Sequence, residues 1–437
     1  MNRHLLLAAA TTCALALGAR AQNIPDGYYK DIFMDSGIML TSRTTLPSAD
    51  ALGLSMEAFV STRHSYTQKY RFTPTDTIRQ RELIAGCPMD ENGILLYPDG
   101  QPRFRMVYMN GGRAANHANS LGEEGKQAYR DFVGAGGSYV GSCAGAYIAC
   151  KGTIKSDGTT GREHQYMGLW PGYARSTGLE KSWTAVDIVK KSPLMTLYSI
   201  EGRPHIDSVR HNGGCYADMQ TAPEGTEVLA LYSTKGRELT KDIDSQPCIW
   251  AYKASASSGR VVLCGSHPEG ASEHDNLALM NAMVRYALDG NGKRVLKGTL
   301  APGDTLKMKA RSGENDPSHA CIGDRQYHYF KIEVPKGADT LTISLDEYLD
   351  RGDYDLYLFA GREAFADGGN CSWCSVAPGV SKTLEIPQPE AGTWYISVFC
   401  ATTVESRQGR YGVEYYGRTD VLNGVPYKIS AALTLNR

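Results

Sequence analysis

The feature that most constrains the fold is a strand that turns at once into a helix around a single cysteine. Residues 138–141 read as a strand, and the run GSCAG at 141–145 leads directly into an apolar helix that extends through Cys150. Glycines on both sides allow a sharp turn that leaves the central side chain exposed on a strained backbone. The sequence therefore predicts a nucleophile elbow with Cys143 as the nucleophile, in preference to a buried cysteine at an ordinary turn.

The segments around this elbow alternate between strands and helices. An apolar strand at 106–109 ends in NGG at 110–112, and a helix at 123–133 with one apolar face ends at the glycine-rich run 134–137. Strand, helix, strand and helix in this order predict a parallel sheet with helices on both faces. Other expected elements are strands at 31–40, 94–97, 228–232, 249–253 and 261–265, and helices at 49–60, 75–85 and 276–288.

The pattern changes to short alternating strands beyond about Lys297. Such strands are expected at 329–334, 340–345, 355–359, 394–399 and 411–415, separated by turns rich in Gly, Pro and Asp. This spacing is typical of a β-sandwich. We expect three parts: a signal peptide at 1–21, an α/β domain at 22–292 and a β-sandwich at 293–437.

The first 21 residues predict export. They have a short basic start, an apolar run from Leu5 to Leu17, and small residues at Ala19 and Ala21. This pattern indicates a cleavable secretory signal, and no later run is long enough for a transmembrane helix. The expected location is the periplasm or the extracellular space of a Gram-negative bacterium. A formal net charge of −1 gives no electrostatic reason to expect nucleic acid as a partner.

A base for the cysteine is expected at His267. It follows the strand at 261–265 in the run HPE, with Glu269 two residues later. In a parallel sheet the carboxyl ends of neighbouring strands share one edge, so His267 can meet Cys143 across the crevice. We expect His267 to act as general base and acid, and Glu269 to orient its ring. Taken alone, the run HPE is better explained as a simple strand or helix cap.

An oxyanion hole is expected from main-chain donors. The amides of Gly111 or Gly112, after the strand at 106–109, would join the amide of Ala144. Further candidates for the cleft are three polar residues: Asn110, His211 and Asn212. No metal-ligand spacing or cofactor motif is present, so we expect neither a metal nor a cofactor.

These motifs resemble the class I glutamine amidotransferase superfamily. Within it, GGSYVGSCAGAY at 136–147, GLWPG at 168–172 and NGGCY at 212–216 are most similar to the amino-terminal domain of biotin protein ligases. The resemblance spans about residues 104–288 and implies a flavodoxin-like sheet and a triad of Cys143, His267 and Glu269. The chain shows no ligase domain and no phosphate-binding loop, which favours a hydrolase acting through an acyl-thioester.

The carboxyl-terminal part resembles the bacterial pre-peptidase C-terminal domain. The runs that carry this likeness are FKIEV at 330–334, DYDLYL at 353–358 and GTWYI at 392–396. The resemblance implies an accessory sandwich on a secreted enzyme, and hence a peptide, protein or peptidoglycan-like amide substrate. The alternatives are a catalytically silent binding protein at the cell surface and a glutamine amidase.

Two smaller motifs lie in the sandwich. Cys371 and Cys374 form a C-x-x-C pair, for which export favours a structural disulfide over a metal or redox site. The pairing is open, because Cys321 and Cys400 can each pair with either member or with each other. Asp353 and Asp355 are compatible with calcium, although a solvated turn is favoured because no six-oxygen ligand set is evident.

Overall fold

The structure is a computed structural model. It describes residues 27–37, 44–59, 67–68, 78–87, 90–196, 204–236, 239, 241–270, 274–310, 317–349, 353–408 and 413–435. The predicted signal peptide at 1–21 lies outside the described residues. No helix in the described ranges is both long and apolar enough to cross a membrane.

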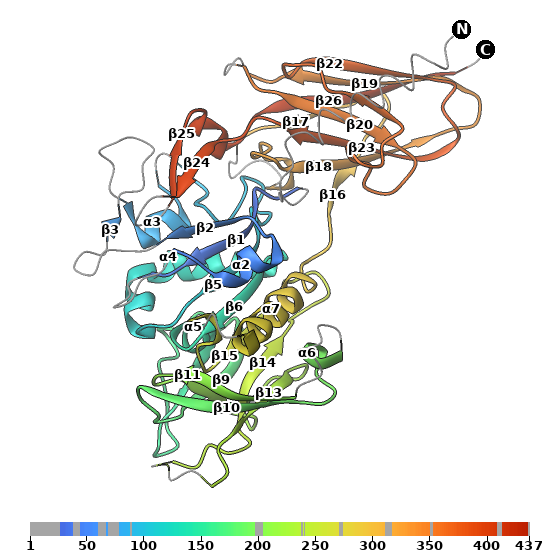
Figure 1. Ribbon diagram of the computed structural model, residues 1–437. Helices are drawn as coiled ribbons and strands as arrows, with labels where there is room; N and C mark the ends of the chain where they lie inside the picture. The colour runs from blue at the N-terminus through green and yellow to red at the C-terminus, as the bar shows by residue number, and fades with distance from the viewer. Residues whose placement is uncertain are drawn as a thin grey trace.

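A nine-stranded mixed sheet is the centre of the amino-terminal part (Figure 1). Its order is β11-β10-β13-β14-β15-β6-β5-β1-β2. The strands are β1 (Lys30–Asp35), β2 (Met56–Phe59), β5 (Phe104–Met109), β6 (Ser138–Ser142), β10 (Ser182–Ile188), β11 (His205–His211), β13 (Glu227–Ser233), β14 (Pro247–Tyr252) and β15 (Val261–Cys264).

Five of the nine strands form the predicted parallel sheet, and the other four extend it. The strands β2, β1, β5, β6 and β15 are parallel, and their chain order across the sheet is 2-1-3-4-5, the flavodoxin order. The other four strands continue the sheet from β15 in antiparallel pairs. The predicted α/β class is therefore confirmed, but the sheet is mixed, because the added strands β14, β13, β10 and β11 run antiparallel to their neighbours.

Helices cover both faces of the sheet. One face is covered by α2 (Pro47–Leu52) and α7 (His274–Leu288), and the other by α3 (Gln80–Ala85), α4 (Ala114–Gly134) and α5 (Ala144–Ala149). Alternate residues of each central strand therefore enter different cores: Met106 and Val140 pack toward α7, whereas Val107 and Tyr139 pack toward α4 and α5. Burial on both faces explains why these strands read as continuous apolar runs.

The predicted helix at 49–60 is only half correct. The structure ends α2 at Leu52, because Gly53 adopts a left-handed conformation with φ 64°, and the chain then enters β2. The predicted helix at 75–85 is observed only as α3, preceded by the short strand β4 (Ile78–Arg79) that pairs with β3 (Thr67–Gln68); residues 75–77 lie outside the described ranges. The expected strand at 94–97 is reduced to a single bridge between Leu96 and Pro102.

A smaller four-stranded sheet, β12-β9-β7-β8, lies beside the elbow. It consists of β7 (Cys150–Ile154), β8 (Thr160–Gly161), β9 (Trp170–Ser176) and β12 (Cys215–Ala217). Trp170 of β9 is fully buried against Trp250 of β14, with ring centroids 5.4 Å apart. This contact fixes the smaller sheet to the large one. The short helix α6 (Pro193–Thr196) precedes β11.

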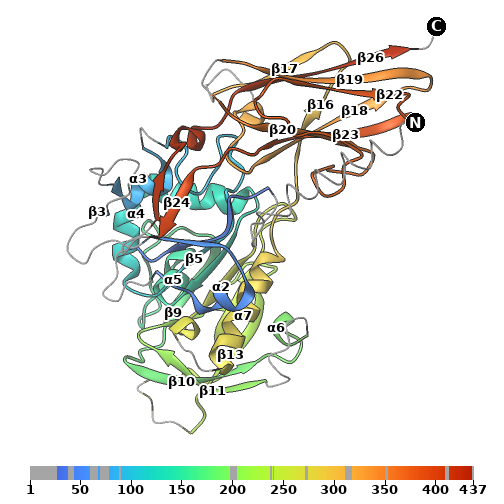
Figure 2. The ribbon, with the colours of Figure 1, turned by 45° about the horizontal axis from the view of Figure 1, so that its top comes forward.

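The carboxyl-terminal part is a β-sandwich (Figure 2). One sheet has the order β16-β18-β23-β20-β21 and the other β17-β26-β19-β22. The strands are β16 (Leu296–Thr299), β17 (Thr305–Met308), β18 (Tyr327–Val334), β19 (Ala338–Glu347), β20 (Leu356–Gly361), β21 (Trp373–Ser375), β22 (Lys382–Pro387), β23 (Gly392–Cys400) and β26 (Tyr427–Leu435). The predicted sandwich is confirmed.

A separate hairpin of β24 (Glu405–Gln408) and β25 (Val413–Tyr416) leaves the sandwich and reaches the α/β part beside β2 (Figure 1). Short 3₁₀-helices complete the part of the chain that the structure describes: η1 (Pro268–Gly270), η2 (Pro317–His319) and η3 (Thr419–Asn423).

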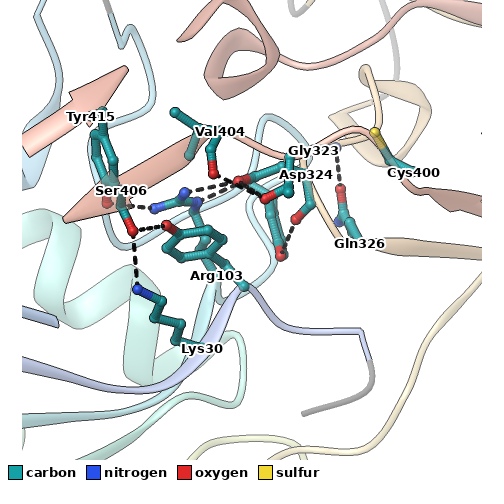
Figure 3. A network of polar contacts seen from close by, with 12 residues as sticks. Lys30, Arg103, Gly323, Asp324, Gln326, Cys400, Val404, Ser406 and Tyr415 are labelled. Carbon is teal, nitrogen blue, oxygen red and sulfur yellow. Dashed lines mark hydrogen bonds and ion pairs between the residues drawn. The ribbon is translucent and has the colours of Figure 1, made fainter. Parts of the chain in front are cut away.

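A buried polar network joins the two parts (Figure 3). The guanidinium of Arg103 donates from Nε and Nη2 to the two carboxylate oxygens of Asp324, at 3.1 and 3.0 Å, and from Nη1 to the Tyr415 hydroxyl at 3.2 Å. The Tyr415 hydroxyl donates to Glu57 at 2.6 Å, and Lys30 pairs with the same carboxylate at 2.8 Å. Because these charges are desolvated yet mutually paired, the network holds the parts in one arrangement.

A second buried cluster lies around Asp99. Its carboxylate pairs with Lys297, accepts from the Gln326 amide and lies 3.4 Å from His328 Nε2. Burial would raise the pKa of Asp99, but Lys297 and His328 hold that pKa well below its usual range. The junction between the α/β part and the sandwich therefore contains buried, paired charges. Removing one partner would leave the other charge buried and unpaired.

The structural disulfide expected for the C-x-x-C pair is not observed in any of its possible pairings, and none of the cysteines in the described ranges forms a disulfide. Cys374 is paired across β21 with Phe359, and both thiols pack at the edge of an aromatic cluster that contains Tyr327 and Tyr329. Packing against aromatic rings is a normal environment for a thiol, which explains how the C-x-x-C spacing occurs without a bond. Near them in the sandwich, the Asp355 carboxylate accepts from the Gly379 amide at 2.8 Å.

Candidate active site

The elbow forms at the carboxyl end of β6. Cys143 precedes α5 and has φ 48° and ψ −104°, a conformation that is unusual for a residue with a side chain. Its amide donates to the carbonyl of Cys264 at 2.8 Å, which ties the elbow to β15. The flanking glycines are required sterically: a Cβ at Gly141 would lie 2.5 Å from the Gly145 carbonyl oxygen, and one at Gly145 would lie 2.1 Å from that of Met109.

His267 and Glu269 lie at the same edge of the sheet, after β15. His267 Nδ1 is 2.9 Å from Glu269 Oε1, and the side chains are 17% and 8% exposed. Burial would lower the pKa of His267, but the Glu269 carboxylate and the Cys143 thiol raise it to about 10. The imidazole therefore interacts with both other members of the predicted triad. The structure brings Cys143, His267 and Glu269 together, and it favours a protonated ring.

Glu269 has polar neighbours that the sequence analysis missed. Burial would raise its pKa, but His267, and more weakly the Ser142 hydroxyl, lower it. The Tyr108 hydroxyl lies 3.3 Å from Ser142 Oγ, so β5 and β6 both contribute hydroxyls next to this carboxylate. Ser142 directly precedes the nucleophile in G-x-C-x-G, and strand alternation sends its side chain to the opposite face of the sheet from its neighbours. That alternation is the signal from which its contact with Glu269 could have been found.

The turn after β5 lies under the imidazole. A Cβ built at Gly111 would lie 2.1 Å from His267 Cε1, so only glycine fits at this position while the ring stays in place. Ala144 is the first residue of α5, and the amide of a first helical residue has no carbonyl partner within its own helix. Gly111 therefore lies beside His267 and Ala144 follows Cys143 directly, whereas an oxyanion hole formed by Gly111 or Gly112 and Ala144 stays a prediction.

Asn110 is buried rather than open to the cleft. It is 3% exposed, and its Nδ2 donates to Ser36 Oγ at 3.0 Å. Its Oδ1 has no hydrogen-bond partner within the described part of the chain. Asn110 therefore joins the ends of β1 and β5.

The segment 211–214 covers the elbow from the side of the smaller sheet. The carbonyl oxygen of Asn212 is 3.5 Å from Cys143 Sγ, whereas its side-chain Oδ1 accepts a hydrogen bond from the Lys181 amide at 3.0 Å. Gly214 lies against β15, since a Cβ there would be 1.7 Å from the Gly265 carbonyl oxygen. Asn212 thus contributes its main chain to the site, not its amide side chain.

His211 is held inside this cover. Its Nε2 is 2.8 Å from Thr177 Oγ1 and its Nδ1 is 3.0 Å from Ser266 Oγ. Burial, and then the nearby His267, lower the pKa of His211 to about 4. The ring is therefore neutral near pH 7. Its hydrogen bonds connect the end of β11 to Thr177 and to Ser266, the residue before His267. Thr177 and Ser266 carry no sequence signal that would have identified them.

No group of three or more His, Cys, Asp or Glu residues among those described could hold a metal ion. The chemistry available at the edge of the sheet comes from a thiol, an imidazole, a carboxylate and main-chain amides. Such a set can carry out nucleophilic attack with general acid and base assistance.

Two family models match the chain. Residues 94–295 match the family described as biotin-protein ligase, N terminal, and residues 326–399 match the bacterial pre-peptidase C-terminal domain. The chain is also 22% identical over 219 residues to an uncharacterized protein of Chlamydia muridarum, covering 49% of this chain and 80% of that protein. The predicted resemblance is confirmed for both parts.

Two solved structures illustrate the similarity. A glutamine amidotransferase has 17% sequence identity and a TM-score of 0.29, covering 43% of this chain and 79% of its own. The pre-peptidase C-terminal domain of a collagenase from Bacillus anthracis has 15% identity and a TM-score of 0.19, covering 32% of this chain and 99% of its own.

Proposed function

We propose that this chain, which joins a class I glutamine amidotransferase-like domain of the biotin-protein ligase amino-terminal type to a pre-peptidase C-terminal domain, is an exported cysteine hydrolase of amide or peptide bonds. The observation that carries the proposal is the position of His267, whose ring interacts with the Glu269 carboxylate and the Cys143 thiol at one edge of the sheet. Pre-peptidase C-terminal domains are typical of secreted bacterial proteins, which supports export.

The first half of the proposed reaction forms a thioester. In the resting pair the proton of Cys143 resides on His267, whose raised pKa favours the protonated ring, and the sulfur anion attacks the carbonyl carbon of the amide. The oxyanion that develops accepts hydrogen bonds from the Ala144 amide and from Gly111 or Gly112, each contributing on the order of 3 kcal/mol. The C–N bond then breaks, and the amine leaves with the proton that His267 carried.

The second half restores the enzyme. His267 removes a proton from water, the hydroxide oxygen attacks the thioester carbonyl, and the C–S bond breaks to release the carboxylic acid. Glu269 stabilises the imidazolium in both halves, because its carboxylate faces Nδ1.

A peptide-library cleavage assay on the wild type and on Cys143→Ala tests this function. Release of new amino termini by the wild type alone supports it, and the cleaved sequences define the substrate class. Ammonia release from free glutamine, with no peptide cleavage, would instead establish the glutamine amidase alternative. A wild type as inactive as Cys143→Ala against peptides, peptidoglycan fragments and glutamine contradicts the proposal.

A matched labelling experiment addresses the silent binding protein. Iodoacetamide should modify Cys143 much faster than the other accessible cysteines, and His267→Ala should slow it. Uniformly slow labelling would favour the binding protein over the hydrolase.

A further inference from the structure

The two carboxylate oxygens of Glu269 have different surroundings. Oε1 is 2.9 Å from His267 Nδ1. Oε2 is buried and has no hydrogen-bond partner among the residues that the structure describes. Because a buried acceptor without a donor costs free energy, a hydroxyl close to Oε2 would stabilise the charged carboxylate strongly.

Two buried hydroxyls approach this carboxylate from the sheet. Ser142 is the last residue of β6, Tyr108 lies near the end of β5, and both are fully buried. Tyr108 belongs to the core between the sheet and α7, and η1, which carries Glu269, also packs against α7. Alternation along β6 places Ser142 on the same face as Val140, another residue of this core. Both hydroxyls and Glu269 therefore lie on one face of the sheet.

The donors and acceptors of this group follow one order. The Tyr108 hydroxyl donates to Ser142 Oγ at 3.3 Å. Burial, and then the Glu269 carboxylate, raise the pKa of Tyr108 well above its usual range, so the phenol keeps its proton and remains a donor. A serine hydroxyl that accepts one hydrogen bond still has its own proton to donate.

The acceptor for the Ser142 proton is the Glu269 carboxylate. Burial would raise the pKa of Glu269, whereas His267, and more weakly the Ser142 hydroxyl, lower it, so this hydroxyl is close enough to act on the carboxylate. Oε1 already faces His267, which leaves Oε2 for the serine.

We propose that Ser142 and Tyr108 are positioning residues of the triad, and that a hydroxyl relay from Tyr108 through Ser142 to Glu269 Oε2 holds Oε1 toward His267. The catalytic role of the relay rests on the hydrolase function proposed above, whereas its effect on the reactivity of Cys143 does not. Without the Ser142 proton, the Glu269 carboxylate is easier to protonate, and the imidazolium loses its partner at a higher pH.

Other titratable groups lie around the pair of Glu269 and His267. Burial raises the pKa of the Cys264 thiol well above its usual range, so this neighbour of Glu269 stays neutral. Burial, and then His267, lower the pKa of His211 to about 4. The helix α7, which packs against η1, carries Asp275 in its first turn. Cys264, His211 and Asp275 are unchanged in the variants below, so differences between variants report the hydroxyls.

The rate at which iodoacetamide modifies Cys143 between pH 4.5 and 8 tests the relay without a substrate. A protonated His267 supports the thiolate, and Glu269 supports that protonated ring while it is ionised. At pH 4.5, Ser142→Ala should react about threefold or more slowly than the wild type, and the two rates should converge toward pH 8. Tyr108→Phe keeps the ring and removes only the first donor, so it should react more slowly at pH 4.5 by a smaller factor.

Ser138→Ala is the matched control. Ser138 is a fully buried serine at the other end of β6 on the same face, and its hydroxyl donates to the Ala287 carbonyl at 2.6 Å instead of to the triad. This variant loses a comparable buried hydrogen bond and should react like the wild type at every pH. Circular dichroism at pH 4.5 verifies folding, and Tyr108→Phe alone decides the outcome if Ser142→Ala is unfolded.

Equal rates in the wild type and Ser142→Ala at pH 4.5 would overturn the relay, and so would an equal loss in Ser138→Ala. The failure of the relay is distinguishable from the failure of the hydrolase. Peptide cleavage by the wild type, with no acid-dependent loss of labelling in Ser142→Ala, would remove the relay alone. The expected labelling pattern in a chain that cleaves no amide bond would support the relay and remove only its catalytic role.

Discussion

Gly111 lies against the imidazole of His267, so closely that a methyl group in its place would be 2.1 Å from Cε1. The lack of a side chain at Gly111 therefore allows the His267 ring to occupy its position, in addition to any role of the Gly111 amide as a donor.

Gly111→Ala should abolish the proposed hydrolase activity without unfolding the chain. The new methyl group must displace the His267 ring, and a misplacement of about 1 Å in a catalytic group costs roughly 100-fold in rate. The measurement is kcat/KM on a cleaved peptide, with circular dichroism to verify folding. Gly134→Ala is the control, because a Cβ there meets nothing within 4 Å. Full activity in Gly111→Ala would show that the ring does not need its present position.

The reactivity of Cys143 should depend on His267 most strongly at acidic pH. The raised pKa of His267 keeps the ring protonated beside the thiol, and such a cation favours the thiolate. We expect iodoacetamide to modify Cys143 at pH 6 about tenfold or more faster in the wild type than in His267→Ala, with the gap closing above pH 9. Equal rates at pH 6 would contradict a thiolate–imidazolium pair.

The His267–Glu269 pair should give stability a defined pH dependence. The folded pKa of His267, about 10, is above its unfolded value of 6.5, so its contribution is complete below 6.5 and is lost as the pH rises toward 10. The lowered pKa of Glu269 makes its contribution complete above its unfolded value of 4.5 and lost in more acidic solution.

Urea unfolding of the wild type and His267→Gln measures this dependence. The stability difference between them should be largest between about pH 4.5 and 6.5 and should decline toward pH 10. His205→Gln is the control, because His205 is 44% exposed and its ion pairs contribute little. A difference between wild type and His267→Gln that does not change with pH would rule out the pairing.

Arg103→Met should lower the free energy of unfolding of the chain. It leaves the buried carboxylate of Asp324 without its cation and removes a second positive charge near Glu57, which costs about 3–5 kcal/mol in the free energy of unfolding. Arg407→Met, which breaks an exposed pair with Glu414, should cost no more than about 1 kcal/mol. Chemical denaturation of both variants tests the contrast, and equal losses would show that the junction network does not stabilise the fold.

The local sequence predicted the parallel half of the sheet and the triad. Glycines around Cys143, an apolar strand before it and HPE after another strand specify a site through steric and positional rules that act over a few residues. The break at Gly53 had a local signal as well, since glycine commonly ends a helix in a left-handed conformation.

Other features depend on residues far apart in the chain. Arg103 and Asp324 are 221 positions apart, and nothing near either residue indicates its partner. The antiparallel direction of β13 and β14, and the contact of Ser142 with Glu269, likewise follow from how whole elements pack. Cys371 and Cys374 show that a local pattern can also mislead. Their spacing suggested a disulfide, but both thiols pack against aromatic rings instead.

By itself, the sequence determined the elbow, the residues of the candidate triad and the two fold classes, because backbone sterics and hydrophobic periodicity are local. Only the tertiary structure decided which side chains surround Glu269 and how the sandwich docks through Arg103. Those outcomes depend on long-range burial, where a charge is stable only beside the particular partner that the folded chain brings to it.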